Sequence, residues 1–338
     1  MKKNVIMCAG IAGIVFLAGC GSSPRAQEVT EVGSASDGYV NDRQSIDQLL
    51  ATEDVKTSID LGSVLGGGVP KDGIPPIDRP EFSSVANAPA WLNSEGDGIL
   101  IERDGQSRFY PYQVLVSHEI VNEEFAGEQL LVTYCPLCFT GVVFDPTVNG
   151  EAVEFGVSGK LWESNLLMYN RSDPESLWSQ ALGEAVVGPA TGDKLDIVRF
   201  DITQYGKYAS SFPDGEVLIG DQDNPRFGGY SRTPYGGDLR NIDPIFPFSG
   251  EDDRLEKTDI ILGLLVEGEP HAFLVSALEQ DGSFTQEFSG RTIEMNFDEA
   301  TGVAVFSDVT SGDAERLTPI PSFWISWVSI HPDTSLYK

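Results

Sequence analysis

The sequence predicts a mainly β protein of the α+β type, built from hairpins and meanders, with two related halves and a few short helices. Short runs of β-branched and aromatic residues alternate with Gly, Asp and Asn, which is the pattern of strands joined by tight turns. Helical periodicity is best developed in two stretches, residues 112–121 and 201–211. In addition, one hairpin pattern occurs twice along the chain.

The repeated hairpin pattern is offset by 163 positions, the separation between Gly105 and Gly268. Its two copies cover about residues 98–150 and residues 260–312. The predicted turn contains Cys135 and Cys138 in the first copy, whereas residues 298–300 occupy it in the second. We therefore expect the cysteine pair to lie on a turn that both halves form, with a functional site in the first half only.

The N-terminus has the features of an export signal. Two lysines precede an apolar run over residues 5–18, which is too short to span a bilayer. Residues 17–20 resemble a bacterial lipobox, so we expect residues 1–19 to be a lipoprotein signal peptide and Cys20 to be lipidated. The sequence thus predicts an extracytoplasmic lipoprotein of the cell envelope that is anchored to the membrane.

The remaining chain divides by composition. Residues 20–70 are rich in Ser, Glu, Asp and Gly and predict a flexible tether, interrupted by a short helical pattern at residues 45–50. Residues 71–338 are expected to form a single large β-rich domain that contains the repeat. Within it, the Gly-, Pro- and Asp-rich residues 220–259 predict a long irregular loop.

Net charge limits the partners that the protein can have. The chain contains 52 acidic and 22 basic residues, which gives a formal net charge of −30. Such a surface disfavours nucleic acid and charge-driven docking on anionic lipid. The expected partner is therefore the membrane through the lipid at Cys20, with no nucleic acid, and the sequence indicates no particular protein partner.

The cysteine pair suggests a metal site. Two sulfurs do not complete the coordination of a tetrahedral ion, so further ligands must come from elsewhere in the chain. His118 is the best placed candidate, 17 residues before Cys135, and Glu119 beside it is a supporting or weaker ligand. His331 is a further candidate from the C-terminal region. Cys135, Cys138 and His118 together suit copper or zinc.

Two alternative hypotheses use the same two cysteines. A thiol–disulfide oxidoreductase needs a thiol with a lowered pKa, and the strand-like sequence after Cys138 lacks the helix that usually provides it. A structural disulfide between Cys135 and Cys138 would close a very short loop and remove little entropy from the unfolded chain. The sequence ranks metal binding first, redox chemistry second and an inert pair last.

A fourth hypothesis is a non-catalytic envelope protein that binds a ligand through residues 156–180. Aromatic and amide side chains there could line a pocket for a sugar or another polar ligand, and packing in the core explains the same residues. These side chains are Trp162, Asn165, Tyr169, Trp178 and Gln180. The sequence does not decide whether the protein is an enzyme, because it contains no recognisable triad spacing, phosphate loop or paired carboxylates.

An ordered set of motifs resembles the bacterial and archaeal domain-of-unknown-function family numbered 3179. The motifs are residues 72–78, 118–122, 132–138, 155–159, 164–169, 176–180, 323–324 and 331–334. The resemblance covers roughly residues 70–338 and implies that His118, Glu119 and the cysteine pair belong to one site. The chain departs from the family at Phe139, where Gly is usual, and in the loop around residues 230–239.

Overall fold

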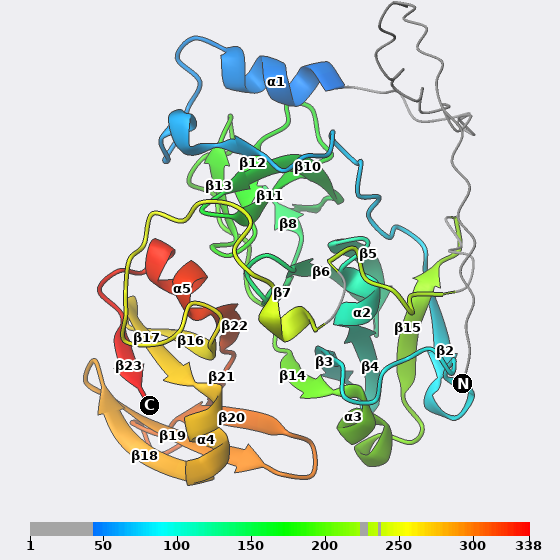
Figure 1. Cartoon of the computed structure of the whole chain (residues 1–338), viewed down its shortest axis with the longest axis vertical. Coiled ribbons are helices and arrows are strands. Elements are labelled where there is room, and N and C mark those ends of the chain that lie inside the picture. Colours follow the sequence, from blue (N-terminus) through cyan, green and yellow to red (C-terminus); the bar gives the residue numbers. More distant parts are fainter. Residues whose placement is uncertain (1–42, 224–228, 236–237) are drawn as a thin grey trace, which may run out of the picture. The chain divides into compact units, whose positions relative to one another are not determined.

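Strands make up 42% of the structure and helices 14%, which confirms the mainly β prediction. The structure is a computed structural model that describes residues 43–223, 229–235 and 238–338. Its small, mostly antiparallel sheets lie in a five-blade propeller-like arrangement with few short helices (Figure 1). No helix in the described ranges has the length and apolar character needed to cross a membrane.

Five sheets and one ribbon contain the strands. The first sheet has the order β1 (Leu65–Gly66), β10 (Phe155–Trp162), β11 (Asn165–Asn170), β12 (Leu177–Ser179), β13 (Glu184–Val187). The second has the order β14 (Asp201–Gln204), β3 (Asp97–Arg103), β4 (Gln106–Pro111), β15 (Glu216–Asp221), β2 (Pro80–Ser84). The third has the order β22 (Ile320–Phe323), β16 (Ile260–Val266), β17 (Glu269–Leu274), β23 (Ser335–Tyr337).

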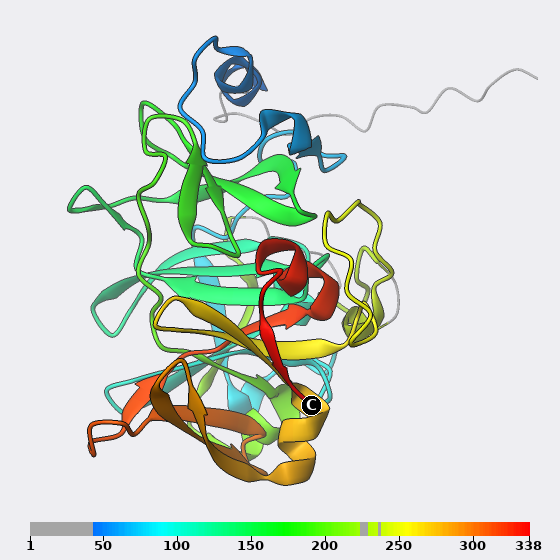
Figure 2. The same cartoon turned by 90° about the vertical axis from the view of Figure 1, so that its left-hand side faces the viewer.

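The two remaining sheets are those in which the predicted turns lie. One has the order β18 (Ser283–Phe288), β19 (Arg291–Asp298), β20 (Val303–Asp308), β21 (Glu315–Leu317). The other is the three-stranded sheet β5 (Ile120–Phe125), β6 (Glu128–Cys135), β7 (Thr140–Phe144). The ribbon consists of β8 (Thr147–Val148) and β9 (Glu151–Ala152). Figure 2 shows β5–β7 between the sheet of β10–β13 and the strands β18–β20.

The helices are short. They are α1 (Arg43–Ala51), α2 (Tyr112–Leu115), α3 (Tyr205–Ser211), α4 (Val275–Asp281) and α5 (Trp324–Ile330), with 3-10 turns at Leu61–Ser63, Val85–Asn87 and Leu239–Asn241. The helix expected at residues 112–121 is shorter than predicted because Glu119 adopts a positive φ of 62° and β5 follows directly. The helix expected from Asp201 begins only at Tyr205, because residues 201–204 pair with β3 as a strand.

The structure contains the same series of strands and helices twice, at the offset that the sequence predicts. The elements β3, β4, α2, β5, β6 and β7 begin at residues 97, 106, 112, 120, 128 and 140, and β16, β17, α4, β18, β19 and β20 each begin 163 positions later. The two-residue turns at Asp104-Gly105 and Glu267-Gly268 both have positive φ angles, as hairpin turns of this length require. Short hairpins with fixed turn chemistry are therefore what both halves share.

The duplication extends further than the sequence predicted. The strand–helix–strand units β14-α3-β15 and β22-α5-β23 begin at residues 201, 205 and 216 and at residues 320, 324 and 335, a constant offset of 119. In both units the second strand runs parallel to a neighbour in its sheet: β15 pairs with β4, and β23 pairs with β17. The signal available in the sequence is a Pro-Asp step after each helix, at Pro213 and Pro332.

The expected tether does not extend to residue 70. Residues 43–51 form α1, in agreement with the short helical pattern, and Leu65 pairs with Leu161 across the edge of the first sheet. Ile46 is buried in a cluster with residues of β11–β13, to which Leu49, Leu50, Val55, Ile59, Leu61 and Val64 also belong. These apolar side chains are too few to form a core alone, but they cover one face of an existing sheet. Residues 1–42, which include the predicted signal and Cys20, lie outside the described residues.

Candidate functional site

The cysteine turn connects β6 to β7 and is buried. Cys135 ends β6 and pairs with Thr140, the first residue of β7. The backbone N–H of Cys138 donates to the Cys135 carbonyl at 3.3 Å, which closes the turn. Both cysteines are free thiols, with exposed fractions of 1% for Cys135 and 0% for Cys138. The site is therefore a buried dithiol on the turn that the repeat predicts.

Both sulfurs face the hairpin between β10 and β11. The Sγ atoms of Cys135 and Cys138 lie 3.8 Å and 3.3 Å from the carbonyl oxygen of Ser164. Glu163 and Ser164 form a two-residue turn in which both φ angles are positive, and this turn aims the Ser164 carbonyl at the pair. The two sulfurs thus converge on one polar atom.

The two thiols hold their protons unequally. Burial raises the pKa of the Cys138 thiol, but hydrogen bonds from Cys135, Ser326 and Asn165 outweigh this effect and the pKa is lowered. Burial raises the pKa of Cys135 well above its usual value, and the hydrogen bond to Cys138 and the charge of Cys138 raise it further. The first proton lost from the pair therefore comes from Cys138, and Cys135 keeps its own.

Glu119 adds a buried carboxyl group next to the pair. Its backbone N–H donates to the Leu115 carbonyl at 2.6 Å, and its own carbonyl accepts from the N–H of Tyr134 at 2.8 Å, so the end of α2 fixes it beside β6. Burial raises the pKa of Glu119 well above its usual value, and any negative charge on Cys135 raises it further. The proton affinity of the carboxyl is therefore linked to the charge of the thiol pair.

The ring of His118 lies between Pro75 and Tyr230. Its Nδ1 lies 2.8 Å from the Pro75 carbonyl oxygen, and its Nε2 lies 2.9 Å from the Tyr230 hydroxyl. Both ring nitrogens are thus engaged with protein oxygens. Across the described part of the chain, no three His, Cys, Asp or Glu side chains are grouped so that they could hold a metal ion. The set of Cys135, Cys138 and His118 is not assembled there, and metal binding stays a prediction.

His331 lies behind the site at the end of α5, the helix that carries Ser326. Its ring packs on Trp327 with a centroid separation of 4.2 Å, and burial lowers its pKa to about 4. A small cavity separates it from Thr140 at the start of β7. His331 therefore belongs to the packing of α5 and does not meet the sulfurs.

The residues predicted as a ligand pocket divide into two groups. Trp178 is fully buried, and its Nε1 donates to Asn170 at 3.0 Å, as in a packed core. Tyr169 donates to Asp72 at 2.5 Å, and Trp162 packs at the edge of the cluster around α1. Asn165 and Gln180 instead belong to the cysteine site, because Asn165 interacts with the Cys138 sulfur and donates to Gln180 at 2.8 Å.

Sequence reasoning missed two tyrosines beside the pair. The rings of Tyr112 and Tyr134 are stacked with centroids 3.9 Å apart, and both hydroxyl groups are buried without a hydrogen-bond partner among the described residues. Burial raises the pKa of Tyr134 well above its usual value, and Tyr112 and Cys135 contribute to the rise. The signal that could have indicated Tyr134 is its position directly before Cys135.

Three non-glycine residues with positive φ surround the thiols: Glu119 at 62°, Phe139 at 54° and Ser164 at 57°. Such backbone conformations cost energy and tend to gather at functional sites. The positive φ at residue 139 explains why glycine is usual there in the family pattern, because glycine adopts this conformation without strain and phenylalanine does not. The ring offsets part of this cost by packing on Tyr112 and Phe323, with centroids 5.3 Å and 5.4 Å away.

Substitution of Phe139 separates the strain from the packing. We expect Phe139→Ala to lower the free energy of unfolding by about 3–5 kcal/mol because it leaves a cavity. Phe139→Gly should be more stable than Phe139→Ala by about 1 kcal/mol, since only glycine adopts the positive φ without strain. Urea denaturation measures the free energy of unfolding of both variants. A Phe139→Gly variant that is less stable than Phe139→Ala would contradict the inference that the backbone at residue 139 is strained.

His331 should make the protein less stable in acid. Its pKa is about 4 in the folded chain and near 6.5 in the unfolded chain, so the unfolded state binds the proton first as the pH falls. The contribution of neutral His331 to the free energy of unfolding is fully present above pH 6.5. It should decline by up to about 3 kcal/mol as the pH falls to 4. His331→Gln should remove this part of the decline. Equal slopes of unfolding free energy against pH in both proteins would refute the assignment.

Comparison with protein families agrees with the motif pattern. The model of the family described as "Protein of unknown function (DUF3179)" matches residues 71–334, which include His118, Glu119 and both cysteines. Comparisons with curated proteins and with solved structures give no match. Since the matched segment is well over half of the 338 residues, the chain belongs to the DUF3179 family.

Proposed function

We propose that Cys135 and Cys138 form a redox-active dithiol that exchanges two electrons with a small disulfide. The observation that carries the proposal is the buried pair itself: both Sγ atoms converge on the Ser164 carbonyl at 3.8 Å and 3.3 Å, and side-chain hydrogen bonding from Cys135, Ser326 and Asn165 holds the pKa of Cys138 below its usual value. The thiolate is the reactive form of cysteine in disulfide exchange. Here side-chain donors provide the stabilisation that a helix N-terminus provides in other dithiol sites.

The proposed exchange has two steps. The Cys138 thiolate attacks one sulfur of the small disulfide, the S–S bond breaks, and one thiolate leaves. Cys135 then gives its proton to that leaving group and attacks Cys138, which releases the second thiolate and forms the Cys135–Cys138 disulfide. The pair is oxidised by two electrons and the small disulfide is reduced to one thiol and one thiolate. Both sulfurs are buried, so a disulfide reaches them only when the segments that cover the turn open, and a small disulfide needs the smallest opening.

Copper binding is the second candidate, and the convergence of both sulfurs on the Ser164 carbonyl favours it. Thiolates are soft ligands that select copper(I) and zinc. His118 does not contribute to this arrangement because its two nitrogens are engaged with Pro75 and Tyr230. A copper site would therefore be built on the two sulfurs.

Ser326→Ala tests the redox proposal, and Ser329→Ala on the same helix is its matched control. Ser326→Ala removes one donor from the thiolate, so the pKa of Cys138 should rise by about one pH unit. Ser329 donates to the Ile325 carbonyl and does not interact with the sulfur, so its variant should react as the wild type does. The measurement is the rate of alkylation by iodoacetamide as a function of pH in the reduced protein.

The same preparations distinguish redox chemistry from metal binding. In glutathione buffers the wild-type pair should cycle between two free thiols and none, and Cys135→Ser and Cys138→Ser should each abolish the cycle. About one equivalent of copper or zinc that is lost in both variants, together with thiols that do not cycle, would replace the redox proposal by the metal proposal. A permanent disulfide or permanently unreactive thiols would refute both.

The redox proposal includes attachment to the membrane of the cell envelope. Its support is the lipobox-like sequence at residues 17–20 after the apolar run. An extracytoplasmic compartment is oxidising, so a dithiol there needs a partner that returns it to the reduced state. A Cys20→Ser variant should lose the lipid mass and leave the membrane fraction. Unchanged mass and fractionation would contradict lipid anchoring and leave the dithiol proposal untouched.

A further inference from the structure

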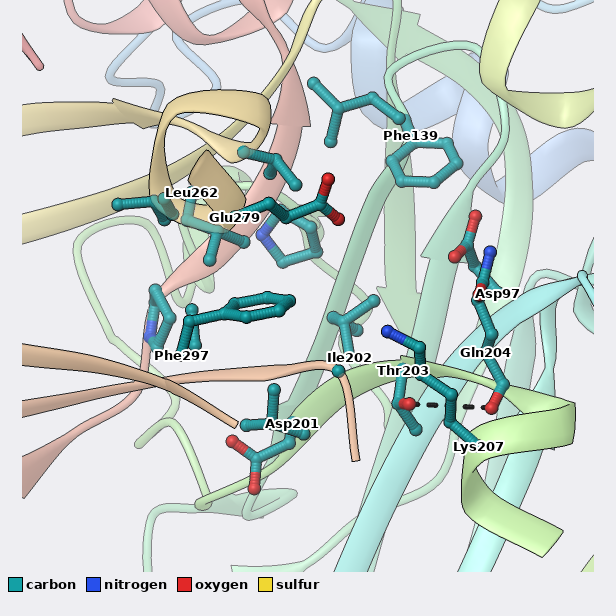
Figure 3. Close-up of a pocket in the computed structure, with 18 of the residues that line it drawn as sticks. Asp97, Phe139, Asp201, Ile202, Thr203, Gln204, Lys207, Leu262, Glu279 and Phe297 are labelled. Atoms are coloured by element: carbon teal, nitrogen blue, oxygen red, sulfur yellow. Dashed lines mark hydrogen bonds between the residues drawn. The ribbon is translucent and has the colours of Figure 1, made fainter. Parts of the chain in front are cut away.

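A second cavity lies outside the cysteine site, between elements of the two halves (Figure 3). It has a volume of about 100 Å³. Residues of β14 and α3 line one side, and residues of β16, α4, β19 and β20 line the other. Phe139 reaches its wall from the cysteine turn.

Apolar side chains line one part of this cavity. Ile202, Leu262, Leu278 and Phe297 come from four different elements, and Figure 3 shows Ile202, Leu262 and Phe297 around one space. An engineered apolar cavity of about 150 Å³ takes up benzene. A space of the present size, open at one side, therefore accommodates a ring or a compact branched group of about six carbon atoms.

Two of the acidic groups at the cavity are paired with arginines. Asp97 binds Arg240 through two hydrogen bonds of 2.5 Å and 2.6 Å, and Asp201 binds Arg316 at 2.6 Å. Glu279 interacts electrostatically with Arg240 as well. Asp97 and Asp201 are thus paired with arginines, whereas Glu279 forms no salt bridge within the described part of the chain.

Lys207 differs from these residues. Its Nζ lies 5.6 Å from the centroid of the Phe297 ring, and its side chain runs along the backbone at Gly302. Asp298 interacts with it electrostatically, but no carboxylate within the described ranges forms a salt bridge with it.

We propose that this cavity binds a small monocarboxylate with a compact apolar body. The apolar body occupies the space between Ile202, Leu262 and Phe297, and the carboxylate accepts a charge-assisted hydrogen bond from Lys207 Nζ. The cavity supplies shape and Lys207 supplies the preference for an anion. This inference does not rest on the dithiol proposal, although the bound molecule would contact Phe139, the residue after Cys138.

Three probes test the inference on the full chain: benzoate, its neutral isostere benzamide, and acetate. In titration calorimetry benzoate should bind, benzamide should bind at least about tenfold more weakly, and acetate should not bind. Benzamide lacks the charge and acetate lacks the apolar body, so the comparison separates the two requirements. Absence of benzoate binding, or equal binding of benzoate and benzamide, would overturn the proposal.

Two variants and a control locate the binding. Lys207→Met keeps an apolar side chain and should reduce benzoate affinity to that of benzamide, whereas Ala304→Leu should fill the cavity and abolish binding of both. Lys194→Met removes a lysine that pairs with Glu184 away from the cavity and should change nothing. Benzoate binding that survives Lys207→Met unchanged would show another site. Should Ala304→Leu fail to fold, the lysine variants and the benzamide comparison still decide.

Discussion

The geometry of the cysteine site depends on the buried amide of Gln180. This side chain is fully buried, and its Nε2 donates to the Thr133 hydroxyl at 2.9 Å and to the Thr140 carbonyl at 3.0 Å. Its Oε1 accepts from Asn165, which leaves Asn165 oriented toward the Cys138 sulfur. One amide therefore fastens the sheet of β10–β13 to both strands of the cysteine hairpin. Without it a buried carbonyl and a buried hydroxyl would lose a partner, at a cost of about 1–3 kcal/mol each.

The duplication explains why only one half carries this chemistry. Both halves form the same hairpins, but the residues of the second turn, such as Glu299 and Ala300, are exposed to solvent. The first turn is covered by the β10–β11 hairpin and by the start of α5, where the N–H of Phe323 donates to the Cys138 carbonyl at 2.7 Å. The difference between the halves lies in what packs against the turn. Burial and the hydrogen bonds from the covering segments, and not the hairpin itself, change the proton affinities of the thiols.

The difference between local hairpins and the segments that pack on them from elsewhere in the chain also explains what could be predicted from the sequence. Hairpins with glycine turns leave a local sequence pattern, so the mainly β fold and the repeat with offset 163 could be predicted. The partners of His118, namely Pro75 and Tyr230, lie 43 and 112 positions away, and no local pattern indicates such contacts. The amides Asn165 and Gln180 were recognised as candidates but for a separate pocket, because sequence spacing does not show which sheet they face. Tyr112 was missed because an aromatic residue in a short helix usually signals only core packing.

Burial of an anion in so acidic a protein requires that neighbouring acids stay neutral. A second negative charge beside a buried thiolate would cost energy at low dielectric, and burial raises the pKa of Glu119 well above its usual value even without that charge. Loss of a negative charge on Cys135 through oxidation would remove one of the two effects that raise the pKa of Glu119. The carboxyl and the two thiols therefore titrate as one unit and not as three independent groups. In the proposed exchange, a change in the charge of the thiol pair would therefore also shift the proton affinity of Glu119.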